Sequence, residues 1–186
     1  MKRLLCLIIL LSAFSGCGNN ENEMKFILSF RQHLLGGNGC SFSAEITADY
    51  GEEIYWFTVL CQGDKQGNLT FTVAKPDNIS GICGLVTDLG GSLTFDETVL
   101  SFPPIADGQI TPVVAPWIFL KTLRSGYIAS CTKADWMLSL QIDAGYHEKA
   151  LHLDIWFDES GSPARGEILW EGRRILSLIV RDFTIL

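Results

Sequence analysis

The sequence lacks the features of a nucleic-acid-binding or bilayer-spanning protein. Acidic side chains outnumber basic ones by 21 to 14, so a net charge of −7 leaves no positive surplus for a phosphate backbone. The apolar run over residues 4–11 is much shorter than the roughly 20 residues that a membrane-spanning helix needs. We therefore expect no nucleic acid as a partner and no segment that crosses a membrane.

Motifs of the common enzyme classes are also missing. The chain has no Gly-x-Ser-x-Gly elbow, no P-loop and no dinucleotide-binding fingerprint. Its histidines, His33, His147 and His152, lack metal-ligand spacing with a cysteine or carboxylate, and we expect His152 on a strand surface. We expect no enzyme, no cofactor and no metal; a hydrolase with an unrecognised site stays an alternative.

The N terminus has the pattern of an export signal. Lys2 and Arg3 form a positive start, an apolar core follows, and small residues lead to Cys17. The tetrapeptide FSGC, residues 14–17, resembles the lipobox of bacterial lipoproteins, whose cysteine receives a diacylglyceryl group before a peptidase cuts in front of it. The resemblance implies that Cys17 is the lipid attachment site. The alternative is an ordinary secretory signal with an incidental Cys17.

Cleavage would define three segments: a signal peptide over residues 1–16, a lipidated tether over 17–22 and a single domain over 23–186. Loss of Lys2 and Arg3 leaves 12 basic against 21 acidic side chains, a net charge of −9. Because each buried CH₂ contributes about 0.8 kcal/mol, two or three acyl chains such as palmitate would anchor the protein stably. We expect it on the extracytoplasmic face of the cell membrane, or at the outer membrane of a two-membrane organism.

The remaining sequence predicts many strands and two helices. Apolar residues have helical spacing over residues 23–35, and a second helix runs from Thr111-Pro112 to Ser125-Gly126, restarting at Pro116. Period-two patterns predict strands over 40–48, 53–62, 68–75, 80–87, 92–98, around Leu100 and Tyr127, and over 136–142, 150–158, 164–170 and 174–183. The fold class is therefore α+β, mainly β: a large, curved antiparallel sheet with helices on one face.

The C-terminal segment LDIWFDESGSPARGEILWEGRRILSLIVRDF completes a wider pattern. With the leading helix, the meandering strands and the central apolar helix, it is similar to the outer-membrane lipoprotein carrier superfamily of LolA, LolB and LppX-type proteins. Asp158, Gly161 and Pro163 fill the first turn of the family's ending, and Glu171-Gly172 the second. The resemblance implies an unclosed half-barrel whose concave face, covered by helices, holds acyl chains.

The first predicted hairpin places two cysteines opposite each other. If residues 50–51 form a two-residue turn, Cys40 faces Cys61 as a non-hydrogen-bonded pair with a Cα separation of about 4.5 Å, within the disulfide range. Because export permits disulfides, we predict a Cys40–Cys61 bridge, with two buried thiols as the alternative. The pairing of Cys83 and Cys131 stays open.

A surplus of apolar residues marks the candidate ligand-binding site. Ile54, Trp56 and Leu60 lie on the face of their strand opposite another apolar set, and the central helix with Trp117 and Leu120 is apolar almost all round. This surplus indicates either a two-sided core or a hydrophobic cavity between sheet and helix, lined by these five residues.

We predict a lipid-anchored, extracytoplasmic monomer that binds an acyl chain, a lipid or a lipoprotein in that cavity. The alternative is an envelope sensor or protein-interaction module on the same fold.

Overall fold

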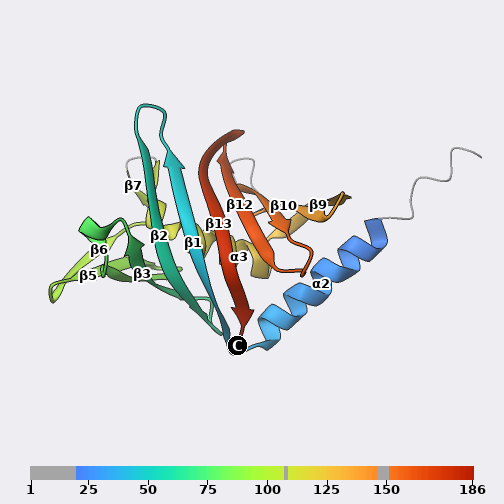
Figure 1. Cartoon of the computed structure of the whole chain (residues 1–186), viewed down its shortest axis with the longest axis horizontal. Coiled ribbons are helices and arrows are strands. Elements are labelled where there is room, and N and C mark those ends of the chain that lie inside the picture. The colour runs from blue at the N-terminus through green and yellow to red at the C-terminus, as the bar shows by residue number, and fades with distance from the viewer. Residues whose placement is uncertain (1–19, 107–108, 146–150) are drawn as a thin grey trace, which may run out of the picture.

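The structure, a computed structural model, describes residues 20–106, 109–145 and 151–186. Most of them form one antiparallel sheet of 11 strands in the order β6-β5-β4-β3-β2-β1-β13-β12-β11-β10-β9 (Figure 1). Its strands are β1 Gly39–Asp49, β2 Ile54–Asp64, β3 Leu69–Lys75, β4 Cys83–Thr87, β5 Gly90–Phe95, β6 Thr98–Phe102, β9 Tyr127–Ala134, β10 Met137–Asp143, β11 His152–Phe157, β12 Pro163–Trp170 and β13 Arg173–Ile185. A separate two-stranded hairpin, β7 Ile105–Ala106 with β8 Gln109–Ile110, was not predicted.

The sheet is an open meander, and it confirms the expected α+β, mainly β half-barrel. Each strand pairs with its neighbour in sequence, except that β1 also pairs with β13 and so joins the N-terminal and C-terminal halves. Both turns that carry the family resemblance are present. One links β11 to β12 across Asp158–Gly161, and the other links β12 to β13 through Glu171 and Gly172, both at positive φ.

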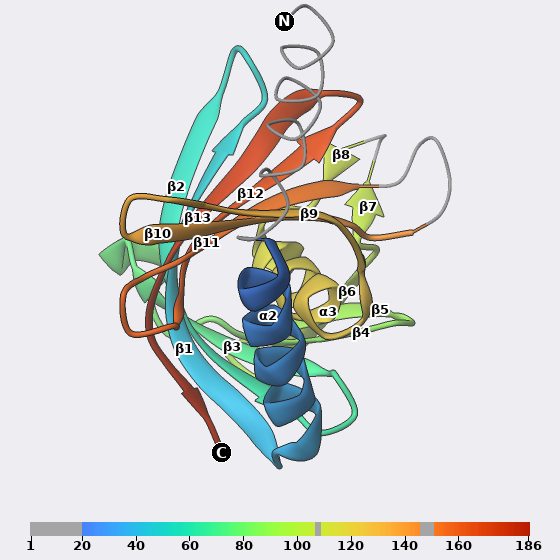
Figure 2. The same ribbon diagram turned by 90° about the vertical axis from the view of Figure 1, so that its right-hand side faces the viewer.

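Two helices cover the concave side of the sheet, as Figure 2 shows. The first, α2 (Asn20–Gly36), begins three residues before the predicted start and includes the end of the predicted tether. The second, α3 (Ala115–Ser125), follows the 3-10 turn η2 (Pro112–Val114), so the helix restarts at Ala115, one residue before the predicted Pro116. The Nε–H of Arg31 donates to the carbonyl oxygen of Leu123 at 2.7 Å and so links α2 to α3. The predicted signal peptide and Cys17 lie outside the described residues.

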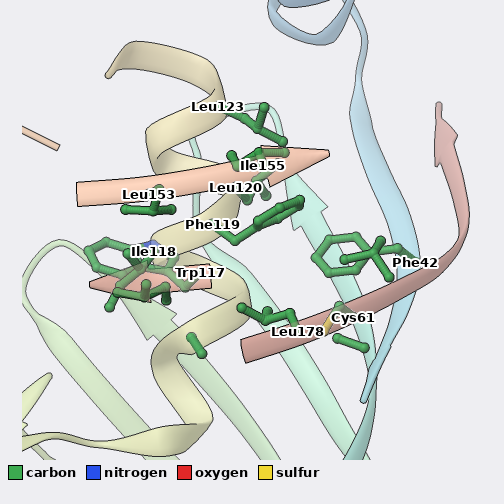
Figure 3. Packing of buried hydrophobic residues seen from close by; sticks show 14 of the residues in the cluster. Phe42, Cys61, Trp117, Ile118, Phe119, Leu120, Leu123, Leu153, Ile155 and Leu178 are labelled. Carbon is green, nitrogen blue, oxygen red and sulfur yellow. The ribbon is translucent and has the colours of Figure 1, made fainter. Parts of the chain in front are cut away.

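The core lies between α3 and the concave face of the sheet (Figure 3). Seven consecutive residues of η2 and α3, from Val114 to Leu120, are buried, and Leu123 is buried one turn later. Two strand glycines let the helix approach closely. A β-carbon on Gly63 would lie 2.4 Å from Leu120, and one on Gly166 would lie 2.7 Å from Phe119. The helix is therefore apolar over most of its circumference because most of it lies in the core.

The register of the first hairpin corrects our prediction by two residues. Cys40 pairs with Gly63 and Cys61 pairs with Phe42, because the turn has four residues, 50–53, instead of two. The carboxylate of Asp49 accepts the backbone N–H of Gly51 at 2.9 Å and stabilises this longer turn. The predicted Cys40–Cys61 bridge is not formed, and the described cysteines Cys40, Cys61, Cys83 and Cys131 are all free.

Candidate functional site

The structure separates the residues expected to line a cavity. Ile54, Trp56 and Leu60 lie on the outer face of β2, where they are 65%, 61% and 56% exposed. The concave face of β2 belongs to Phe57, Val59 and Cys61, because these alternate with the outer set and pair with the apolar residues of β1. The prediction that these three residues face Trp117 and Leu120 across an apolar space is therefore wrong.

Trp117 and Leu120 belong to the core and hold α3 in place. Leu120 is fully buried against Gly63, and Trp117 is 7% exposed. The indole Nε1–H of Trp117 donates to the carbonyl oxygen of Gly67 at 3.1 Å, and the ammonium of Lys121 lies 4.6 Å from the ring centroid. These contacts assign both residues to packing and support the two-sided core for this helix.

A pocket of about 330 Å³ opens at the N-terminal half of α2, between that helix, the β9–β10 turn and the β11–β12 turn. We call it the α2 pocket. Its size is at the lower end of the 300–1,000 Å³ typical of small-molecule sites. Its apolar lining consists of Phe26, Trp136, Leu138 and Phe157. Its polar lining consists of Asn22, Glu23, Lys133, Asp158, Glu159, Ser160 and Gly161.

The apolar residues of the α2 pocket form a fixed floor and two exposed walls. Phe157 and Leu138 are buried in the core, and the rings of Phe26 and Phe157 meet edge to face with centroids 6.0 Å apart. Trp136 is 56% exposed and Phe26 is 39% exposed, although both are large aromatic side chains. The sequence pattern predicts Trp136 at the start of a strand but not its exposure. In the structure Trp136 follows Asp135, a turn residue at positive φ, and this place beside a tight turn explains the exposure.

The β11–β12 turn forms a rigid, negatively charged rim. One carboxylate oxygen of Asp158 accepts the backbone N–H of Ser160 at 2.9 Å, that of Ser162 at 3.0 Å, and the hydroxyl of Ser160 at 2.6 Å. Burial alone would raise the pKa of Asp158, but these hydrogen bonds outweigh it and hold the pKa below its ordinary value. The carboxylate thus stays charged at neutral pH.

Glu23 adds a second carboxylate to the same pocket. Its Oε2 atom is buried and has no hydrogen-bond partner among the described residues. Burial first, and the charge of Glu23 second, raise the pKa of the neighbouring Cys131 thiol. With Glu159 also in the lining, three carboxylates face one ammonium, that of Lys133, so the pocket disfavours an anionic ligand.

A larger groove of about 720 Å³ lies on the outer face of the sheet, across β1 to β5, and we call it the outer groove. Leu60, one of the predicted site residues, lines it beside Leu85 and the exposed thiol of Cys83. The other outward-pointing residues are polar: Ser41, Ser43, Gln62, Thr70, Thr72, Ser92, Thr94 and Asp182. A lining of hydroxyl and amide groups suits a polar ligand better than an acyl chain.

His152 lies on the outer face of β11, between two carboxylates. Its Nδ1 is 2.8 Å from Asp143 and its Nε2 is 3.3 Å from Asp154, and the side chain is half-buried. Within the described parts of the chain, no group of three histidine, cysteine, aspartate or glutamate residues is placed to hold a metal ion. His147 lies outside those parts. Nor does any described helix have the length and hydropathy needed to cross a membrane.

Comparisons with known proteins find similar folds at low sequence identity. No family model and no curated protein matches the sequence. A putative outer-membrane lipoprotein-sorting protein domain from Vibrio parahaemolyticus has a TM-score of 0.47 and 11% identity, over 90% of this chain and 93% of that one. A LolA superfamily protein from Nitrosomonas europaea has 0.44 and 9%, over 88% and 93%. The Mycobacterium tuberculosis lipoprotein LppX has 0.40 and 12%, over 87% and 96%.

Proposed function

We propose that the protein is a lipid-anchored binding protein, not an enzyme, and that the α2 pocket receives the apolar chain of an amphiphile. One observation carries the proposal: two exposed aromatic side chains, Phe26 and Trp136, stand over a buried apolar floor of Leu138 and Phe157. An acyl chain between them would cover aromatic surface that now faces water.

The position of the pocket in the chain suits a ligand taken from a membrane. Glu23 and Phe26 line the pocket from the first two turns of α2, whose first residue is Asn20. Cys17 precedes Asn20 by three residues, and three residues span at most about 11 Å. If Cys17 carries the lipid anchor, the α2 pocket opens close to the lipid surface.

The charges that line the α2 pocket predict which head groups it prefers. Glu23, Asp158 and Glu159 outweigh Lys133, so a carboxylate head would be repelled, whereas a hydroxyl or ammonium head would be accepted. Affinity would come mainly from the chain, at about 0.8 kcal/mol per buried CH₂, or roughly fourfold per methylene until the pocket is full.

Native mass spectrometry of the membrane-extracted protein tests the proposal, together with titration of primary alcohols of 6 to 12 carbons against a neutral fluorescent probe. We expect a co-purified amphiphile and an affinity that rises with chain length. We also expect dodecylamine to bind better than dodecanol, and laurate to bind worst. A protein that carries no co-purified amphiphile and binds alcohols of every chain length equally poorly would overturn the proposal.

The outer groove supports a second candidate, a protein-interaction module. Its row of outward hydroxyl groups provides donors and acceptors for a polar chain. In a pull-down from envelope extract, replacement of Thr72 and Thr94 by valine would then abolish capture of a partner, while the equivalent change at Thr132, on β9 far from the groove, would not. Capture that survives the double replacement would reject this candidate.

A further inference from the structure

Strand β6 is one of the two edges of the sheet, and no described strand pairs with its outer side. Its sequence, Thr-Val-Leu-Ser-Phe, has no charge, no proline and no irregularity in its pairing with β5. Val99 is 62% exposed on one face and Leu100 is 63% exposed on the other. Edge strands usually carry charges, bulges or a covering element, because a bare edge pairs with other strands. The opposite edge, β9, contains Lys133 and packs against α2.

The turn before β6 determines which of its backbone groups point outward. Asp96 and Glu97 both have positive φ, 45° and 63°, as a two-residue hairpin turn requires, and Phe95 pairs with Thr98 across it. Hydrogen-bonded and non-hydrogen-bonded pairs alternate along an antiparallel ladder. Thr98, Leu100 and Phe102 therefore bond to β5, and Val99 and Ser101 direct their N–H and C=O groups away from the sheet.

We propose that β6 pairs with β6 of a second copy of this chain, antiparallel, about a two-fold axis at Leu100. In this register Val99 of each copy exchanges hydrogen bonds with Ser101 of the other, so all outward groups of both residues are satisfied. An axis at Val99 would place Ser101 against the turn residue Glu97, and an axis at Ser101 would place Val99 against Pro103, which has no N–H.

The side chains are compatible with this self-pairing. On one face of the paired strands, the exposed Leu100 would face Leu100 of the second copy, and Thr98 would face Phe102, so the leucines would cover each other. The acidic turns at Asp96-Glu97 would lie at opposite ends of the paired strands, which avoids like charges facing each other. The interface is isologous, as in most dimers. Because each copy contributes only five residues, the interface is weak. The dimer would therefore form where membrane anchoring concentrates the chains.

Cysteine cross-linking of the full chain tests the register. In a Cys83→Ser background, Leu100→Cys would place two thiols across the axis as a non-hydrogen-bonded pair, with Cα atoms about 4.5 Å apart. Val99→Cys is the matched control: it is equally exposed, but its thiol would lie opposite Ser101 of the second copy. We expect a reducible dimer for Leu100→Cys in intact membranes and a monomer for Val99→Cys and for the parent.

Equal cross-linking of both variants, cross-linking of neither, or a conjugate of Leu100→Cys with a different protein would overturn the proposal. Because a cysteine replaces a leucine, a Ser101→Pro variant provides a second measurement. Its missing N–H points away from β5, so the fold should be retained. Added to the Leu100→Cys, Cys83→Ser chain, it should reduce cross-linking at least fivefold; unchanged cross-linking with a wild-type circular dichroism spectrum would contradict the pairing.

Discussion

Phe26 rests against Gly161 where α2 meets the β11–β12 turn: a β-carbon added to Gly161 would lie 2.9 Å from Cζ of Phe26. Gly161 also has a φ of +79°, a conformation that other residues adopt only with strain. Glycine is thus favoured at this position both by the backbone and by the aromatic ring beside it. The contact joins a wall of the α2 pocket to its rim.

Replacement of Gly161 by alanine should therefore destabilise the protein and weaken ligand binding. The matched control is Gly172→Ala, because Gly172 has a similar φ of +76° but no atoms within 4 Å of an added β-carbon. In urea denaturation we expect both variants to lose about 1 kcal/mol through backbone strain, and Gly161→Ala to lose more. Equal losses of stability and unchanged probe binding by both variants would show that the Phe26 contact is unimportant.

Leu120→Ala should destabilise the fold without a direct effect on the α2 pocket. Leu120 is fully buried, and truncation of such a leucine typically lowers the free energy of unfolding by about 2 to 5 kcal/mol. Leu60→Ala, on the outer face, should change it by less than about 0.5 kcal/mol. Urea denaturation checks both. If Leu120→Ala instead kept full stability and lost ligand, the cavity beneath α3 that we exclude would have to be present.

Thiol labelling of the folded protein should separate Cys83 from the three buried cysteines. Cys83 is exposed, whereas burial raises the pKa of Cys40, Cys61 and Cys131 and keeps their thiols protonated. We expect Cys83 to react at once with a thiol reagent at pH 8 and the other three only after unfolding. Mapping of unreduced peptides should find no Cys40–Cys61 link, and finding one would contradict the free thiols.

The same burial should make stability fall at alkaline pH. The pKa of Cys61 is raised in the folded state, so its contribution is fully present below the unfolded pKa of about 8.5 and is lost as pH rises above it. The midpoint of urea unfolding should therefore drop between pH 8 and pH 10, and a Cys61→Ala variant should show a smaller drop. An identical drop in both proteins would assign the effect to other groups.

Cys17→Ser should release the protein from the membrane. The expectation rests on the positive start, the short apolar core and the small residues before Cys17. Fractionation of cells into membrane and soluble parts measures the effect, and Cys83→Ser, at an exposed cysteine of the folded domain, is the control. Retention of Cys17→Ser in the membrane fraction would reject the lipid anchor.

Strand positions were predictable because one face of each central strand is buried. In β1 the apolar set Phe42, Ala44 and Ile46 alternates with polar residues, and the structure buries that set in the core. The register was not predictable, because shifts of two residues keep every side chain on the same face. The carboxylate of Asp49 accepts a hydrogen bond from the backbone N–H of Gly51 and so favours the four-residue turn. The alternation of apolar and polar residues does not reveal this hydrogen bond.

The site was harder to predict than the fold. Surplus apolar residues do not show which face of a strand is covered, so Trp56 was assigned to the interior although it faces solvent. The α2 pocket depends on three segments far apart in sequence, which meet only because β13 brings the C-terminal strands beside β1. Phe26 and Trp136 are single residues in unrelated patterns, and no spacing rule connects them.

The most direct test of the account compares two tryptophans of similar exposure, Trp136 in the α2 pocket and Trp56 on the outer face, 56% and 61% exposed. Each is replaced by alanine, and the binding of a neutral fluorescent amphiphile is titrated. Full burial of a large apolar side chain is worth about 1.5 to 3 kcal/mol, so Trp136→Ala should weaken binding at least tenfold, while Trp56→Ala should leave it within twofold of wild type. Equal affinities for the two variants, or a larger loss for Trp56→Ala, would contradict the assignment of the ligand to the α2 pocket.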